Sequence, residues 1–173
     1  MPLRAGILTA SDRSFRGERE DQSGLILKEL LMAYGADVGI YLITPDDKDI
    51  IAGTLKRWAD DLSLQLILTT GGTGLSLRDQ TPDATREVIE KEIPGISELL
   101  RAKSAEKTPM AMLSRAVAGI RGTCLIVNLP GSPSAVRESF EILKPVLVHA
   151  VELLGGMVKD CSAYSSSSSA HSL

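Results

Sequence analysis

Four loops of the sequence combine acidic, hydroxyl and glycine residues in patterns that could hold a phosphorylated substrate. They read TASDR at 9–13, TPDD at 44–47, TTGGTG at 69–74 and LPGSPS at 129–134, and each follows a short aliphatic run. Where a glycine-containing turn leads from a strand into a helix, its free backbone N–H groups can bind phosphate or another anion. The loops therefore indicate an anion site, to which their carboxylates could add a cation.

The third loop places three glycines, Gly71, Gly72 and Gly74, within four residues of a buried strand. Glycine loses more backbone freedom on folding than any other residue. Something therefore has to approach this backbone closely, or the turn needs unusual dihedral angles. The loop has neither the GK[ST] of a P-loop nor the G-x-G-x-x-G spacing of a dinucleotide site. Taken alone, it is equally typical of a tight strand-to-helix connection.

Two acidic loops flank the glycine loop in the expected fold. Asp79 follows Gly74 by five residues, and Asp46 lies beside Asp47 in TPDD. Each carboxylate could cap a helix or complete a turn. Each could also bind Mg²⁺, which takes few carboxylates, keeps water and bridges to substrate phosphates. Their combination favours a metal–phosphate site, in which Arg78 could contact an anion or pair with a carboxylate.

Groups for nucleophilic hydrolysis are poorly placed in the sequence. Ser132 has no evident histidine partner and lacks the G-x-S-x-G elbow of the hydrolases. His149 falls in a late predicted helix, and His171 lies near the end of the chain. We therefore expect chemistry that needs no histidine base.

Apolar runs and capping residues predict the elements that position these loops. Strands are expected at 4–11, 36–43, 64–70 and 123–129, with helices between them. One helix should begin at an Asp21 N-cap, and another at a Thr81 N-cap with Pro82 at its first position. This alternation predicts an α/β fold, a mostly parallel sheet covered by helices on both faces. Ligands bind beyond the carboxyl ends of the strands in such folds.

Composition narrows the class of protein. The 173 residues suit one domain, expected over 1–160, and a serine-rich tail at 161–173 is expected to be mobile. Aromatic residues make up 3% and the net charge is −3, which argues against nucleic-acid binding. Cys124 is expected in the core, and Cys161 offers it no disulfide framework. No run is long enough to cross a membrane, so the expected location is the cytoplasm.

Taken together, the motifs resemble one known family. SDRSFRGEREDQSG, TPDD, LTTGGTGLSLRDQTPDAT and LSRAVAGIRGTCLIVNLPGSPSAVRESFE occur in the order seen in the molybdopterin adenylyltransferases of molybdenum cofactor biosynthesis, which are related to the gephyrin G domain. The resemblance covers about residues 4–156. It implies a three-layer α/β/α fold and a homotrimer. It also implies transfer of AMP from ATP to molybdopterin, with Mg²⁺ present and pyrophosphate released.

The family pattern also implies roles for individual residues. Asp46 and Asp79 match the two acidic residues essential for activity and are the expected catalytic and metal-binding pair. The attacking phosphate of molybdopterin is already ionised, so no strong base is required. The expected substrate- and nucleotide-binding residues are Ser11, Asp12, Asp21, Ser23, Thr70, Gly71, Gly72, Gly74, Arg78, Ser114, Asn128, Pro130, Gly131 and Ser132.

Other functions share the same motifs. A paralogous branch of the family could bind molybdopterin with little or no adenylyl transfer, and gephyrin-like proteins use the domain as a scaffold. The RDQTPDA and IVNLPGSP segments look closer to the adenylyltransferase branch. Expected partners are therefore the small-molecule substrates, with transient contact to other enzymes of the pathway.

Overall fold

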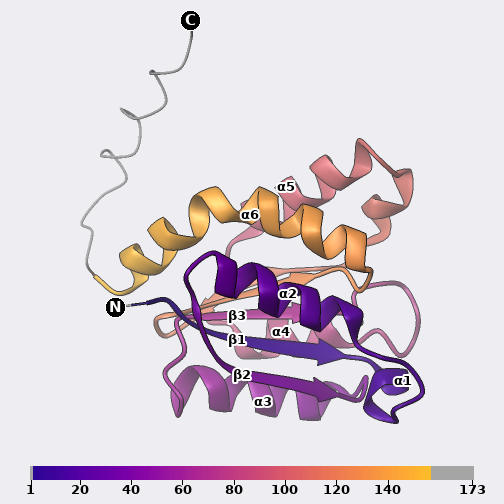
Figure 1. Cartoon of the computed structure of the whole chain (residues 1–173), viewed down its shortest axis with the longest axis horizontal. Helices are drawn as coiled ribbons and strands as arrows, with labels where there is room; N and C mark the ends of the chain where they lie inside the picture. The colour runs from indigo at the N-terminus through magenta and orange to yellow at the C-terminus, as the bar shows by residue number, and fades with distance from the viewer. Residues whose placement is uncertain (1, 157–173) are drawn as a thin grey trace, which may run out of the picture.

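A six-stranded sheet forms the centre of the molecule (Figure 1). The structure, a computed structural model, describes residues 2–156, so the predicted tail, Cys161 and His171 lie outside the described residues. The strands run in the spatial order β2–β1–β3–β6–β5–β4. Their bounds are β1 Arg4–Ala10, β2 Asp37–Thr44, β3 Leu66–Thr70, β4 Lys91–Glu92, β5 Ala118–Arg121 and β6 Cys124–Leu129.

The four expected strands are β1, β2, β3 and β6, and they pair in parallel. β5 and β4 add an antiparallel edge. The 3₁₀ helix η1 (Pro109–Leu113) precedes β5, which turns back on β6 through Gly122 at a φ of 54°. The predicted mostly parallel α/β fold is confirmed.

Helices cover both faces of the sheet (Figure 1). One layer contains α2, α5 and α6, and the other contains α3 and α4. The short α1 lies at the end of β1 and β2. The helix bounds are α1 Asp12–Phe15, α2 Gln22–Ala33, α3 Lys48–Asp60, α4 Thr81–Val88, α5 Pro94–Ala105 and α6 Pro133–Leu154.

Each central strand is apolar on both faces because both faces are covered. Leu66 and Leu68 of β3 point into the core beneath α2 and α6, while Ile67 points into the core above α3 and α4. All three side chains are fully buried. Trp58 of α3 and Phe140 of α6 are the largest buried side chains, one in each core. Alternate residues of one strand thus join the two helical layers to the sheet.

The helix starts confirm one sequence prediction and correct another. Asp21 caps α2 as predicted, accepting a hydrogen bond from the Gly24 N–H at 3.0 Å. The prediction that Thr81 caps α4 was wrong. Gln80 holds the N-cap position without a side-chain hydrogen bond, and Thr81 is already helical. Pro82 therefore stands at the second helical position, which suits it equally because no N–H is needed there.

Candidate functional site

The loops after β1 and β2 join through two reciprocal hydrogen bonds. The strands are parallel and end in register, Ala10 opposite Thr44. The Asp12 N–H donates to Asp46 Oδ2 at 2.9 Å, and the Asp46 N–H donates to Asp12 Oδ1 at 3.1 Å. Because β3 lies on the other side of β1, the glycine loop ends at the same edge. Three of the four predicted loops are therefore adjacent.

Arg78 pairs with Asp12 across this edge. Its Nε donates to Asp12 Oδ2 at 3.0 Å and its Nη2 to Oδ1 at 2.9 Å, a bidentate arrangement. Desolvation alone would raise the pKa of Asp12. The Arg78 guanidinium and the Asp46 N–H outweigh it, so the pKa of Asp12 lies below its ordinary value. Of the two interpretations of Arg78, the structure shows the ion pair.

Asp46 has the opposite electrostatic environment. Burial is the main cause that raises its pKa above the ordinary value, and the negative charges of Asp12 and Asp79 raise it further. The Asp12 N–H and Arg78 oppose this effect without cancelling it. Three carboxylates thus influence one another beside a single guanidinium. An ionised Asp46 would be favoured by an added positive charge.

Asp79 faces the glycine loop and also closes its own turn. Its Oδ2 accepts from the Ser76 N–H at 2.8 Å, while its own N–H donates to the Ser76 carbonyl at 2.9 Å. The turn interpretation is therefore correct for one carboxylate oxygen. Within residues 2–156, no hydrogen bond is present to Oδ1 of Asp79 or to Oδ1 of Asp46, which leaves one oxygen of each for a ligand.

The Asp46 and Asp79 carboxylates fit a magnesium ion whose other ligands are mostly water and phosphate oxygens. Among the described residues, no three Asp, Glu, His or Cys side chains form a complete metal cluster. Mg²⁺ does not need one, because one or two carboxylates suffice when substrate phosphates complete its shell. The local excess of negative charge supports this fit. Asp47 is excluded from the set, because its carboxylate caps α3 by accepting from the Asp49 and Ile50 N–H groups.

The glycines of the third loop make room for other parts of the site. Gly71 and Gly72 adopt φ values of 88° and 61°, which side chains rarely tolerate. A Cβ on Gly71 would lie 2.3 Å from the Ala10 carbonyl oxygen, and one on Gly74 would lie 2.9 Å from Asp79 Oδ2. The loop thus has both the unusual dihedral angles and the close approach to its backbone that the sequence suggested. The atoms that approach the backbone in the structure belong to the protein itself.

The fourth loop is tied to the others by two hydroxyl groups. Thr70 Oγ1 donates to the Pro130 carbonyl at 2.8 Å, and Ser23 Oγ donates to the Gly131 carbonyl at 2.7 Å. Ser132 then caps α6, its Oγ accepting from the Ala135 N–H at 3.3 Å. These contacts fix the LPGSP loop beside the glycine loop. Thr70 and Ser23, both predicted as binding residues, make loop-anchoring contacts in the structure.

Three predicted binding residues, Asp21, Asn128 and Ser11, use their polar groups within the protein. Asp21 accepts from the Gly24 N–H and from the Tyr41 hydroxyl at 2.5 Å, beneath α2. Asn128 is fully buried and makes three hydrogen bonds through its side-chain amide, two donated and one accepted. Ser11 likewise caps α1. Their contacts indicate a supporting role around the site.

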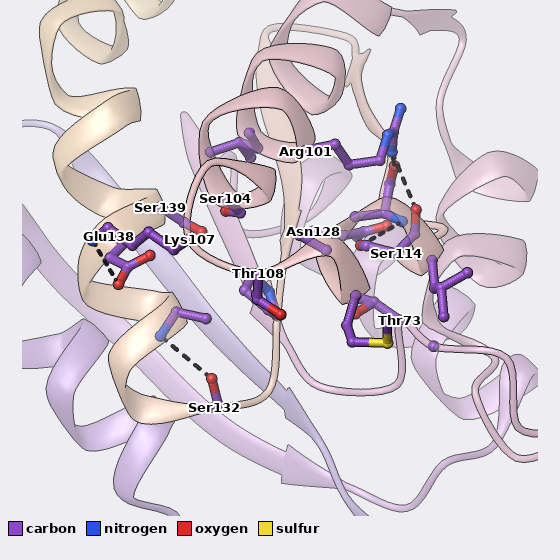
Figure 2. Close-up of a pocket in the computed structure, with 18 of the residues that line it drawn as sticks. Thr73, Arg101, Ser104, Lys107, Thr108, Ser114, Asn128, Ser132, Glu138 and Ser139 are labelled. Atoms are coloured by element: carbon purple, nitrogen blue, oxygen red, sulfur yellow. Dashed lines mark hydrogen bonds and ion pairs between the residues drawn. The ribbon is translucent and has the colours of Figure 1, made fainter.

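A cavity of about 510 Å³ opens beside the glycine and LPGSP loops (Figure 2). It lies between α5, η1 and the start of α6. Its lining includes five residues that were predicted to bind substrate, namely Gly74, Ser114, Asn128, Pro130 and Ser132. A second cavity of about 380 Å³ lies on the other side of the LPGSP loop, next to Ser23 and Gly131. The predicted residues therefore border both spaces.

Polar residues of α5, of the turn that follows it and of α6 at the larger cavity were missed from the sequence. Lys107 and Glu138 form an ion pair of 2.8 Å, seen at the left of Figure 2. Arg101 Nη1 donates to the carbonyls of Ala116 at 2.8 Å and Ser114 at 3.4 Å. Neither group lies in a glycine or acidic loop, so no motif marked it. Only the tertiary packing of α5 and the turn after it against α6 brings these residues to the cavity.

Cys124 and His149, the cysteine and the histidine within the described residues, lie outside the acidic and glycine loops. Cys124 is buried in the core as predicted, and burial raises the pKa of its thiol to about 12. His149 lies in α6. In the part of the chain described, no helix is long and apolar enough to cross a membrane.

Comparison with known proteins agrees with the arrangement of the loops. The family described as "Probable molybdopterin binding domain" matches residues 6–149. The molybdopterin adenylyltransferase of Helicobacter pylori strain J99 is 42% identical over 156 residues, covering 89% of each chain. The molybdenum cofactor synthesis protein cinnamon of Drosophila melanogaster is 46% identical over 151 residues. These cover 87% of this chain and 25% of cinnamon, so this chain spans about a quarter of that relative.

A solved structure extends the likeness to three dimensions. The crystal structure of the molybdopterin biosynthesis enzyme MoaB from Thermus thermophilus superposes with a TM-score of 0.84 at 52% identity. The match covers 89% of this chain and 97% of that one. Sequence, fold and coverage agree over the region that contains all four loops, and the chain belongs to the molybdopterin-binding domain family of molybdenum cofactor biosynthesis.

Proposed function

We propose that this chain is a molybdopterin adenylyltransferase, which transfers AMP from Mg-ATP to the terminal phosphate of molybdopterin and releases pyrophosphate. One observation carries the proposal. Asp12, Asp46 and Asp79 gather around Arg78 and the glycine loop, at the carboxyl ends of parallel strands and beside a large cavity. The relatives named molybdopterin adenylyltransferase cover most of the chain, which supports the same activity.

The reaction depends mainly on groups that position the two substrates and neutralise the charge of their phosphates. Groups that transfer protons matter less. An oxygen of the molybdopterin phosphate forms a bond to the α-phosphorus of ATP, and the bond from that phosphorus to the bridging oxygen breaks as pyrophosphate leaves. Asp46 and Asp79 would hold Mg²⁺, and the ion would supply positive charge to the phosphates. Helix α6 begins at the LPGSP loop, so its N-terminus favours an anion there. These residues align the two anions.

Pyrophosphate release tests the proposal. Release from Mg-ATP should require molybdopterin in the wild type and should fall by about 10²-fold or more in Asp79→Asn. A matched Asp61→Asn variant, which changes an acidic residue at the end of α3, should retain the wild-type rate. Release that is independent of molybdopterin, or unchanged in Asp79→Asn, would contradict the proposal.

One observation favours a second candidate, a molybdopterin-binding paralogue with little transfer activity. The solved MoaB structure at 52% identity is described only as a molybdopterin biosynthesis enzyme. The same assay separates the two functions, because the paralogue would bind molybdopterin without releasing pyrophosphate. The homotrimer, the cytoplasmic location and contacts with other enzymes of the pathway remain predictions. Sedimentation of the purified protein tests the trimer.

A further inference from the structure

Thr81 contains a buried hydroxyl group for which the fold provides no partner. Its side chain is fully buried at the start of α4, and its Oγ1 makes no hydrogen bond within the described residues. The backbone around it is fixed. The Thr81 N–H donates to the Gly72 carbonyl at 3.1 Å, and its carbonyl accepts from Thr85 Oγ1 at 2.8 Å. An unpaired buried hydroxyl is costly, so its presence calls for a role.

The hydroxyl faces a carboxylate oxygen that is also unpaired. A Cβ on Gly72 would lie 2.4 Å from Thr81 Oγ1 and 3.1 Å from Asp46 Oδ1, so both oxygens face the same side of this glycine. The other oxygen of Asp46 already accepts from the Asp12 N–H. A free donor and a free acceptor therefore lie against the same side of one glycine, which has no side chain to separate them.

We propose that Thr81 is a positioning residue for Asp46. Its hydroxyl donates to Asp46 Oδ1 when the cation and nucleotide bind, and this bond holds the carboxylate in the orientation that the cation requires. The inference rests on the proposed function, in which Asp46 binds the cation. Partners that orient a metal-binding carboxylate typically change metal affinity by about 10- to 100-fold when they are removed. Because Thr81 Oγ1 and Asp46 Oδ1 lie against the same side of Gly72, Thr81 acts through Asp46.

The competing explanation is that Thr81 is only a packing residue, and stability distinguishes the two. In Thr81→Val a methyl group replaces a hydroxyl that has no partner, so the melting temperature of the ligand-free protein should not fall. Thr85→Val is the matched control on the same helix. Thr85 is equally buried, but its hydroxyl donates to the Thr81 carbonyl and accepts from Asn128 Nδ2. Its loss should lower the melting temperature by about 2–4 °C or more.

Calorimetric titration with ATP, in excess Mg²⁺ and separately in EDTA, supplies the decisive measurement. Thr81→Val should bind Mg-ATP about tenfold more weakly than the wild type and bind ATP in EDTA equally well. Thr81→Ser, which keeps the hydroxyl, should restore the affinity. Thr85→Val should bind Mg-ATP like the wild type. In the adenylylation assay, Thr81→Val should change kcat/KM in the same direction as the affinity.

Asp46→Asn separates failure of this inference from failure of the proposed function. Mg²⁺ strengthens ATP binding if the affinity in excess Mg²⁺ exceeds that in EDTA. If this gain is lost in Asp46→Asn but kept in Thr81→Val, Thr81 has no positioning role and the proposed function stands. If Asp46→Asn also keeps it, Asp46 does not bind the cation and both proposals fall. Weaker binding in Thr81→Val that Thr81→Ser does not restore would also overturn the inference, because the hydroxyl would then not be responsible.

Discussion

The glycine loop shows how single residues set the distance between parts of the site. Gly72 has a φ of 61°, and a Cβ on it would lie 2.4 Å from Thr81 Oγ1 and 3.1 Å from Asp46 Oδ1. A side chain here would have to occupy a left-handed conformation and displace a hydroxyl held by α4. The glycine therefore determines how closely the acidic loop after β2 can approach the start of α4.

Substituting this glycine should be costly, whereas substituting a helical glycine should not. We expect Gly72→Ala to lower the free energy of unfolding by about 2 kcal/mol or more, from left-handed strain and the contact with Thr81. Gly53 lies inside α3, where a Cβ meets nothing within 4 Å. Gly53→Ala should raise stability by about 0.5–1 kcal/mol. Urea denaturation measures both, and equal stability of the two variants would contradict this account of Gly72.

At the scale of elements, Asn128 links β6 to its neighbours. Its Nδ2 donates to Thr69 Oγ1 at 3.0 Å and to Thr85 Oγ1 at 2.9 Å, which joins β6 to β3 and α4. Its Oδ1 accepts from the Val117 N–H at 3.2 Å, just before β5. One amide thus connects two strands, one helix and the approach to the antiparallel edge.

Removing this amide should destabilise the protein more than it impairs binding. Asn128→Ala leaves the Val117 N–H buried without its partner and opens a small cavity, so the free energy of unfolding should fall by about 2–4 kcal/mol. Mg-ATP affinity, measured by calorimetry well below the melting temperature, should stay within about threefold of the wild type. A large loss of affinity with unchanged stability would instead show that the amide binds substrate.

Across the whole molecule, the sequence predicted what is local and periodic. The four parallel strands, the Asp21 cap and the adjacency of the acidic and glycine loops follow from apolar runs and from the geometry of parallel sheets. Thr81 was misassigned because a threonine before a proline is typical of an N-cap, and only the tertiary path of the loop puts Gln80 there. The Lys107–Glu138 pair could not be foreseen, because it depends on how the turn after α5 packs against α6.

The electrostatic environment of Asp46 also affects the stability of the entire fold. Burial, together with Asp12 and Asp79, raises the pKa of Asp46 in the folded state. A carboxylate with a raised folded-state pKa destabilises the protein at any pH above that pKa, and the cost disappears as the pH falls through it. Bound Mg²⁺ should remove the same cost at neutral pH, since a ligand that binds only the folded state stabilises it.

We therefore expect Asp46→Asn to be more stable than the wild type at pH 7 in EDTA, although it should lose activity. The difference in melting temperature should shrink as the pH is lowered through the raised pKa of Asp46, because the wild-type carboxyl becomes neutral like the amide. Mg²⁺ at ten times its dissociation constant should add about 1.4 kcal/mol to the wild type alone. Sodium chloride at matched ionic strength controls for screening. Equal stabilisation of both proteins by Mg²⁺ would show that the cation binds elsewhere.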